Sequence, residues 1–146
     1  MKKPVILHTK GEEDRIASIL PEYPNTYLVH WYSCEEYLDQ YLALSCYFSI
    51  GPDVLWNPPV RTLAARVPQN RILIETDGMG AVKWAYEALK TPKNSQLADA
   101  RENTKNVEDA LTHTLLETAA IRQTEPGVLA KQIQKNLIWG FLSASK

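Results

Sequence analysis

Four short apolar runs, each separated from the next by a stretch with helical spacing, constrain the fold of this chain more than any other feature. The runs cover residues 4–7, 27–29, 47–50 and 72–74, and the intervening stretches cover residues 12–20, 35–44 and 58–67. Proline, asparagine or glycine stands at most of the breaks. This alternation of strand-like and helix-like segments predicts an α/β fold with a parallel sheet and helical crossovers.

The spacing of these units narrows the choice of fold. The runs end near positions 8, 30, 50 and 77, so that successive units are 22, 20 and 27 residues long. A (β/α)₈ barrel of ~250 residues averages roughly 30 residues per unit. The 146 residues of this chain therefore have room for half of such a barrel. A doubly wound open sheet is the other fold that the alternation permits.

The remainder of the chain is predicted to be helical. Residues 103–122 and 127–142 each carry an amphipathic apolar stripe, and the polar residues 90–99 between them and the last strand predict a loop. The length fits one domain of ordinary size, and no further repeat or low-complexity tract stands out. We therefore expect residues 1–146 to form a single domain.

Composition excludes several classes of protein. With 16 Lys and Arg against 17 Asp and Glu, the net charge of -1 argues against a protein that coats nucleic acid. It still allows an enzyme that holds a phosphate with a few well-placed groups. No stretch approaches the ~18 apolar residues of a membrane span, and no signal peptide is present, so we expect a cytoplasmic protein without membrane contact. The two cysteines, Cys34 and Cys46, are expected to be packed and free of disulfides.

Polar side chains stand directly after three of the four apolar runs. His8 follows the first run, His30 follows the second, and Glu75 and Asp77 follow the fourth. Because the carboxyl ends of parallel strands meet at one rim of a sheet, we expect these side chains to converge. Imidazole and carboxylate groups form a ligand set that Zn²⁺ or Mn²⁺ accepts. The pattern therefore predicts a divalent metal site that activates water. The remaining histidine, His113, is expected to be a surface or partly packed residue of its helix.

Several of these segments resemble the TatD-related family of metal-dependent hydrolases. They are Pro-Val-Ile-Leu-His at 4–8, Leu-Val-His-Trp-Tyr-Ser at 28–33 and Pro-Gln-Asn-Arg-Ile-Leu-Ile-Glu-Thr-Asp at 68–77. Asn136 and Phe141 are similar to the family's closing Asn-x-x-x-x-Phe pattern. The resemblance implies strands five to eight of an amidohydrolase-type (β/α)₈ barrel, followed by C-terminal helices. It also implies an enzyme that holds divalent metal and cleaves phosphodiesters, notably in DNA.

The resemblance implies roles for individual residues. His8 and His30 resemble the metal-ligand histidines of the fifth and sixth strands. Asp77 resembles the aspartate after the eighth strand, which works with the metal and the attacking water. Glu75 matches an accompanying glutamate, which we expect to support the ligands rather than bind the metal. The residues do not indicate whether the metal is Zn, Mn or Mg.

The chain also departs from the family pattern. The family's first-strand His-x-His and fourth-strand glutamate have no counterpart, and Met79 stands where a proline is usual. Trp31-Tyr32-Ser33-Cys34 replaces the frequent Cys-Phe-Ser-Gly. Trp31 and Ser33 flank His30 and are expected either to touch substrate or to pack in the loop. Four aromatic residues are expected near the rim and would suit base stacking or a partner surface equally well: Trp31, Tyr32, Trp56 and Trp84.

These patterns predict a metal-dependent hydrolase of DNA or another phosphodiester. One alternative is a non-catalytic remnant, because much of the family's metal site is absent. Another is an amidohydrolase-type enzyme acting on a carbon–nitrogen or ester bond. A half barrel would leave sheet edges and an interior face uncovered. The expected partners are therefore a second copy of the chain or a complementary N-terminal half, unless the natural chain begins upstream of Met1.

Overall fold

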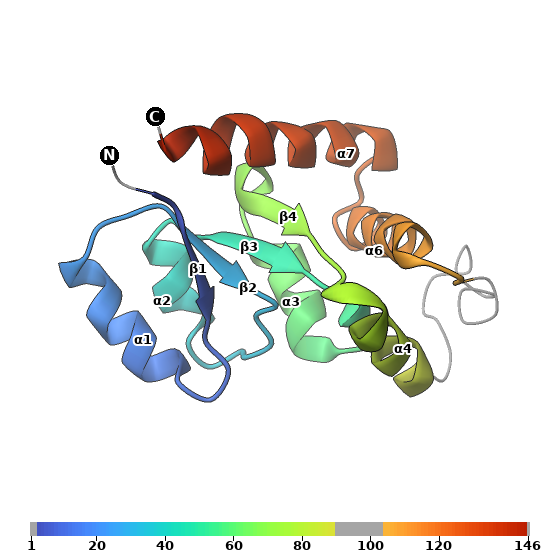
Figure 1. The fold of residues 1–146 in the computed structure, drawn as a ribbon, viewed down its shortest axis with the longest axis horizontal. Helices are drawn as coiled ribbons and strands as arrows, with labels where there is room; N and C mark the ends of the chain where they lie inside the picture. Colours follow the sequence, from blue (N-terminus) through green and yellow to red (C-terminus); the bar gives the residue numbers. More distant parts are fainter. Residues whose placement is uncertain (1–2, 90–103, 146) are drawn as a thin grey trace.

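A computed structural model describes residues 3–89 and 104–145 of the chain, which contain one four-stranded parallel sheet (Figure 1). The strands are β1 (Val5–His8), β2 (Tyr27–His30), β3 (Tyr47–Ile50) and β4 (Ile72–Ile74), in the order β1-β2-β3-β4. Each neighbouring pair is parallel, and His8 is the register partner of His30. The prediction of an α/β fold with a parallel sheet is thus confirmed.

Helices connect the strands and complete the chain. The connecting helices are α1 (Glu13–Ile19), α2 (Leu38–Ala43) and α3 (Pro58–Arg66), and the later ones are α4 (Gly78–Ala88), α6 (Val107–Ile121) and α7 (Pro126–Lys135). A π-helical turn, Asn136–Phe141, continues α7 and leads into a 3₁₀ turn, Leu142–Ser145. Shorter 3₁₀ turns cover Leu20–Glu22, Pro52–Leu55 and Gln69–Arg71. The loop predicted at residues 90–99 lies outside the described residues.

One helix, α4, is not predicted by apolar periodicity. Gly80 stands in its first turn, where glycine lowers helix propensity by about 1 kcal/mol relative to alanine. The helix forms nevertheless, because Val82, Ala85 and Tyr86 on its inner face are buried. Tertiary packing thus decides the structure of this segment.

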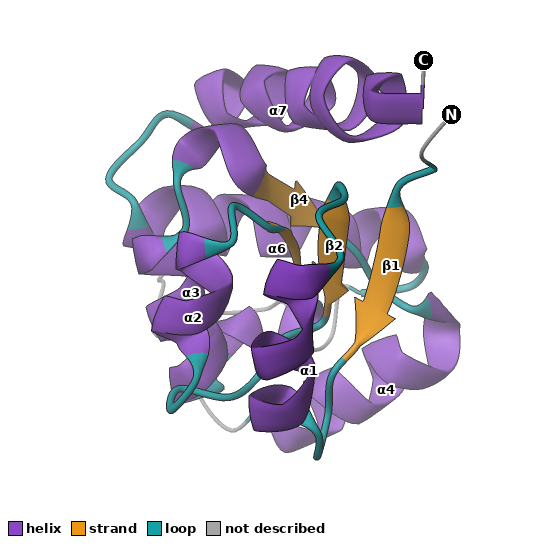
Figure 2. Ribbon diagram, turned by 90° about the vertical axis from the view of Figure 1, so that its left-hand side faces the viewer, coloured by secondary structure: helices purple, strands orange, loops and turns teal. Residues whose placement is uncertain are grey.

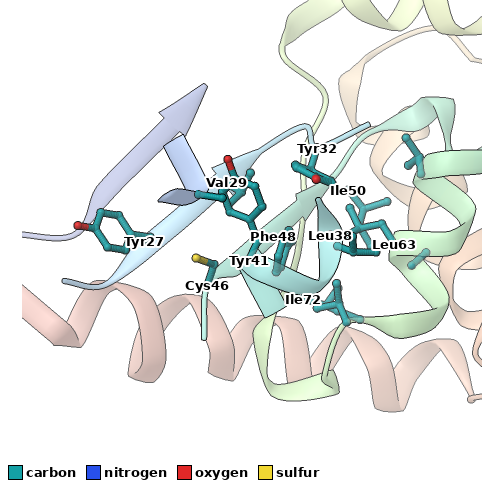
Figure 3. Close-up of a cluster of buried hydrophobic side chains, with 14 of the residues drawn as sticks. Tyr27, Val29, Tyr32, Leu38, Tyr41, Cys46, Phe48, Ile50, Leu63 and Ile72 are labelled. Carbon is teal, nitrogen blue, oxygen red and sulfur yellow. The ribbon is translucent and has the colours of Figure 1, made fainter. Parts of the chain in front are cut away.

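One face of the sheet carries the main hydrophobic core. Strand side chains point alternately to the two faces, so that Val29, Phe48 and Ile72 share one side and pack against the helices that connect the strands. Leu38 of α2 and Leu63 of α3 are fully buried against them (Figure 3). Burial of these side chains fixes the three connecting helices on one side of the sheet and leaves the other side for different elements.

The opposite face is partly covered by the C-terminal helix. Phe141 packs against Leu28 and Leu73 there. The Asn136 side-chain amide donates to the carbonyl oxygens of Gln69 and Ile72, at 2.9 and 2.8 Å, and so ties this helix to the start of β4. Figure 2 shows α7 at one end of the strands and α4 at the other. The carboxyl end of the sheet is thereby left to loops and α4.

None of the helices within residues 3–89 and 104–145 is both long and apolar enough to cross a membrane.

Candidate metal centre

His30 lies at the centre of a group of polar side chains at the carboxyl end of the sheet. It shares the sheet face of Leu28, because the two residues stand two positions apart on β2. Its Nδ1 lies 2.6 Å from a carboxylate oxygen of Glu75, and its Nε2 lies 3.7 Å from Oδ1 of Asp77. The ring of His8 meets the His30 ring edge-on, with centroids 4.5 Å apart. The structure thus brings together the four residues that the sequence predicts to converge.

The carboxylate of Glu75 is held by a network of donors. Its Oε1 accepts the backbone N–H of Trp31 at 2.9 Å and the hydroxyl of Ser49, while Oε2 faces His30. Burial raises the pKa of Glu75, and the hydrogen bond from Ser49 and the charge of His30 offset part of that rise. Both carboxylate oxygens are therefore engaged within the protein, and the His30 ring is oriented with Nδ1 toward Glu75 and Nε2 toward Asp77.

Asp77 occupies a backbone conformation that keeps its side chain at the rim. Its φ of 54° is left-handed, which aspartate tolerates better than most residues, and Gly78 follows with a φ of 83°. This pair turns the chain from the end of β4 into α4. The Asp77 side chain is 61% exposed, so its carboxylate is accessible to a ligand.

The donor set of this centre fits a divalent cation. Ligand atoms of His30, Glu75 and Asp77 lie within 4.8 Å of one another. Two ligands at 2.0–2.1 Å from one tetrahedral Zn²⁺ lie about 3.4 Å apart, which is close to the 3.7 Å between His30 Nε2 and Asp77 Oδ1. The mixture of imidazole nitrogen and carboxylate oxygen suits Zn²⁺ or Mn²⁺.

A cavity of about 500 Å³ opens beside this centre. Its lining includes every predicted site residue except Glu75, which lies behind His30. The other lining residues are not predicted to belong to the site by apolar periodicity, although several of them closely follow an apolar run. The lining residues are His8, Thr9, Lys10, His30, Trp31, Ser33, Asp53, Trp56, Asn57, Asp77, Ala81 and Trp84.

Tyr32 does not lie at the rim as predicted, whereas His113 is partly packed as predicted. Tyr32, grouped with the rim aromatics in the sequence, belongs to the core, where its ring packs against Tyr41 and Phe48 at centroid distances of 5.2 and 6.1 Å. The left-handed φ of 45° at Trp31 turns the chain after β2, so that Trp31 lines the cavity and Tyr32 packs inward. His113 is half-buried, and its Nδ1 lies 2.7 Å from the Tyr86 hydroxyl.

Comparison with known sequences decides the family. A sequence model of the family described as TatD related DNase matches residues 1–141. The chain belongs to the TatD family. The resemblance seen at His8, His30 and the Glu75–Asp77 segment is thus confirmed at the level of the family.

Individual TatD relatives agree with this membership. An uncharacterized metal-dependent hydrolase of Haemophilus influenzae is 31% identical over 90 residues, which cover 60% of this chain and 34% of the relative. A TatD homolog from Escherichia coli K12 has a similar structure, with a TM-score of 0.72 and 19% identity over 96% of this chain and 50% of its own. An uncharacterized amidohydrolase from Saccharomyces cerevisiae has a TM-score of 0.68 and 15% identity over 94% of this chain and 53% of its own.

The chain spans about a third of the curated relative and about half of each of the two solved structures. At 15% and 19% identity, the structural likeness establishes the fold. It does so over almost the whole of this TatD family member.

The hydrogen bonds around Glu75 should affect the affinity of the site for metal. Glu75→Gln is expected to weaken Zn²⁺ or Mn²⁺ binding about 10- to 100-fold, because a neutral amide orients the His30 ring less firmly than a carboxylate. A titration against a competing chelator measures this affinity. The matched control is Glu22→Gln, at an exposed glutamate outside the cavity. Equal affinities for the wild type and the Glu75 variant would contradict the supporting role of Glu75.

Proposed function

We propose that this chain is a cytoplasmic TatD-type hydrolase that cleaves phosphodiester bonds with metal-activated water, with DNA as its substrate. The observation that carries the proposal is the convergence of His30 Nε2 and Asp77 Oδ1 at one rim, with the His8 ring alongside. Family membership supports the hydrolase class, and the two free cysteines suit a reducing compartment.

The proposed roles follow from the geometry of the rim. His8, His30 and Asp77 would hold a Zn, Mn or Mg ion, and Glu75 would keep His30 in place. A bound ion would lower the pKa of water and offset the charge of a phosphodiester. The accessible carboxylate of Asp77 would orient the attacking water and accept its proton.

Two residues that line the cavity would bind the substrate directly. Lys10 is exposed at the cavity and would contact a phosphate oxygen. Ser33, which lines the cavity near His30, would donate a hydrogen bond to the substrate. Both roles would hold the phosphodiester in the cavity that the metal ligands also line.

We place the four strands as the fifth to eighth of a (β/α)₈ barrel, within a single domain of residues 1–146. The span of about half of each related structure supports this placement. β1 is the first strand in the sheet order, so one of its edges has no neighbouring strand among the described residues, and Ile6 on its face is 56% exposed; both support a further element beside this strand. A second copy of the chain or a complementary N-terminal half would provide it.

The test is cleavage of a fluorescently labelled single-stranded oligonucleotide with Mn²⁺ or with EDTA. We expect products that accumulate with Mn²⁺ and none above background with EDTA. Absence of cleavage by folded protein that binds Mn²⁺ would overturn the nuclease assignment, and hydrolysis of ester or amide substrates would then identify an amidohydrolase-type enzyme. Absence of Mn²⁺ binding as well would identify a non-catalytic remnant.

A further inference from the structure

We propose that Trp31, Trp56 and Trp84 form a subsite that stacks a nucleobase of the substrate. The inference rests on the proposed function and adds a binding surface to it. All three indoles line the same cavity as His30 and Asp77. The Trp84 ring contacts the other two edge-on, with centroids 6.2 Å from Trp31 and 5.6 Å from Trp56. Together they form a continuous aromatic wall beside the metal centre.

The two inner indoles are held rigidly. The backbone N–H of Trp31 donates to Glu75, and its ring lies against Gly51, where a Cβ atom would come within 2.6 Å of a ring carbon. The indole N–H of Trp56 donates to the Ala85 carbonyl at 2.8 Å, on the helix that carries Trp84. A wall fixed in this way loses little conformational entropy when a ligand binds.

The third indole offers the surface for stacking. Trp84 is 51% exposed although its ring contacts both neighbouring indoles, at interplanar angles of 65° and 61°. An indole that two neighbouring rings hold in place and that is still half exposed offers aromatic surface to a flat ligand, because stacking of a base on an aromatic ring stabilises the complex whatever the base.

Polar groups in the same cavity distinguish a nucleobase from an alkyl chain or apolar peptide. Asp53 is almost fully buried, and its Oδ2 accepts from the Asn57 side-chain amide at 2.8 Å. Its Oδ1 has no hydrogen-bond partner among the described residues. Lys10 also lines the cavity. Rings beside hydrogen-bonding groups and a cation match a ligand with a flat face, a polar edge and a phosphate, which is the chemistry of a nucleotide.

The position of the wall connects it to the reaction. Trp31 follows His30 directly in the chain, and Trp84 lies on α4, which begins immediately after Asp77. Because Trp84 also lines the same cavity as His30 and Asp77, a base stacked on it would belong to a nucleotide whose phosphate can reach these residues. The subsite would place the scissile phosphodiester by binding the base next to it.

The test separates base stacking from phosphate binding and from cleavage. Fluorescence anisotropy would measure the affinity of the full chain, in EDTA, for a labelled tetradeoxyadenylate and for an abasic tetramer of equal charge. We expect the adenylate to bind about 10-fold more tightly or better, since each stacked base contributes substantially to affinity. Trp84→Ala should abolish this difference. Trp139→Ala, at a tryptophan that is 73% exposed and outside the cavity, should preserve it.

Equal binding of the two tetramers by the wild type would overturn the subsite, as would an equal loss of discrimination in the two tryptophan variants. Because the assay contains no free metal, it is independent of cleavage. Base discrimination without Mn²⁺-dependent cleavage would overturn the nuclease function and leave a base-binding wall. Cleavage without base discrimination would overturn the wall alone.

Discussion

Asp77→Asn is expected to lower Mn²⁺-dependent cleavage of DNA roughly 10²- to 10⁴-fold, the usual contribution of a positioned acid or base. The amide has nearly the same shape as the carboxylate but carries no charge and accepts no proton. Asparagine also tolerates the left-handed φ of 54° at this position, so the turn into α4 should be preserved. Initial rates of oligonucleotide cleavage at saturating Mn²⁺ measure the effect.

The control for this experiment is Asp39→Asn. Asp39 is exposed on α2, where it pairs with Arg66, and it lies outside the cavity. Its replacement should leave the cleavage rate within about twofold of the wild type, because a surface ion pair contributes only ~0–1 kcal/mol to stability. A rate for Asp77→Asn equal to that of the control would remove Asp77 from the proposed mechanism.

The parts of the fold that the sequence predicts are those governed by local rules. The strand β3 covers residues 47–50 as the apolar run predicts, and the ends of β1, β2 and β4 differ from their runs by one residue or less. The convergence of His8, His30, Glu75 and Asp77 also follows from local rules, because strands of a parallel sheet end at one rim. Whether these residues bind metal stays a prediction.

The parts that the sequence does not predict depend on tertiary contacts. Ser49 lies within an apolar run, and only the sheet register shows that it donates to Glu75. Asp53 resembles an ordinary turn residue, yet it is buried in the cavity wall. Tyr32 stands beside Trp31 in the sequence, but the left-handed turn at Trp31 separates a cavity residue from a core residue. The sequence alone does not show which of these side chains face the cavity, which support the site and which are buried in the core.

The cavity wall is also connected to an ion pair between α3 and α6. Arg61 of α3 pairs with Glu117 of α6, whose side chain is only 2% exposed, and donates to the Val54 carbonyl at 2.9 Å. Val54 belongs to the turn Pro52–Leu55, which also contains Asp53. One guanidinium group therefore fixes α3, α6 and part of the cavity wall together.

Removal of that guanidinium should be strongly destabilising. Arg61→Ala leaves the Glu117 carboxylate buried without its counter-charge, and we expect the free energy of unfolding to fall by roughly 3 kcal/mol. Urea denaturation followed by circular dichroism measures this change. Arg66→Ala on the same helix is the matched control, because its ion pair with Asp39 is exposed and should contribute at most about 1 kcal/mol.

A double variant tests whether the uncompensated charge is the cause. Arg61→Leu combined with Glu117→Leu removes both charges and keeps apolar volume, so it should recover most of the stability that Arg61→Ala loses. If the double variant is as unstable as Arg61→Ala, the loss comes from the hydrogen bond to Val54 and from packing. If Arg61→Ala and Arg66→Ala are equally stable, the buried pair does not hold α6 against the cavity wall. The expected order, in which Arg61→Ala is less stable than both Arg66→Ala and the double variant, would show that an uncompensated buried charge causes the loss.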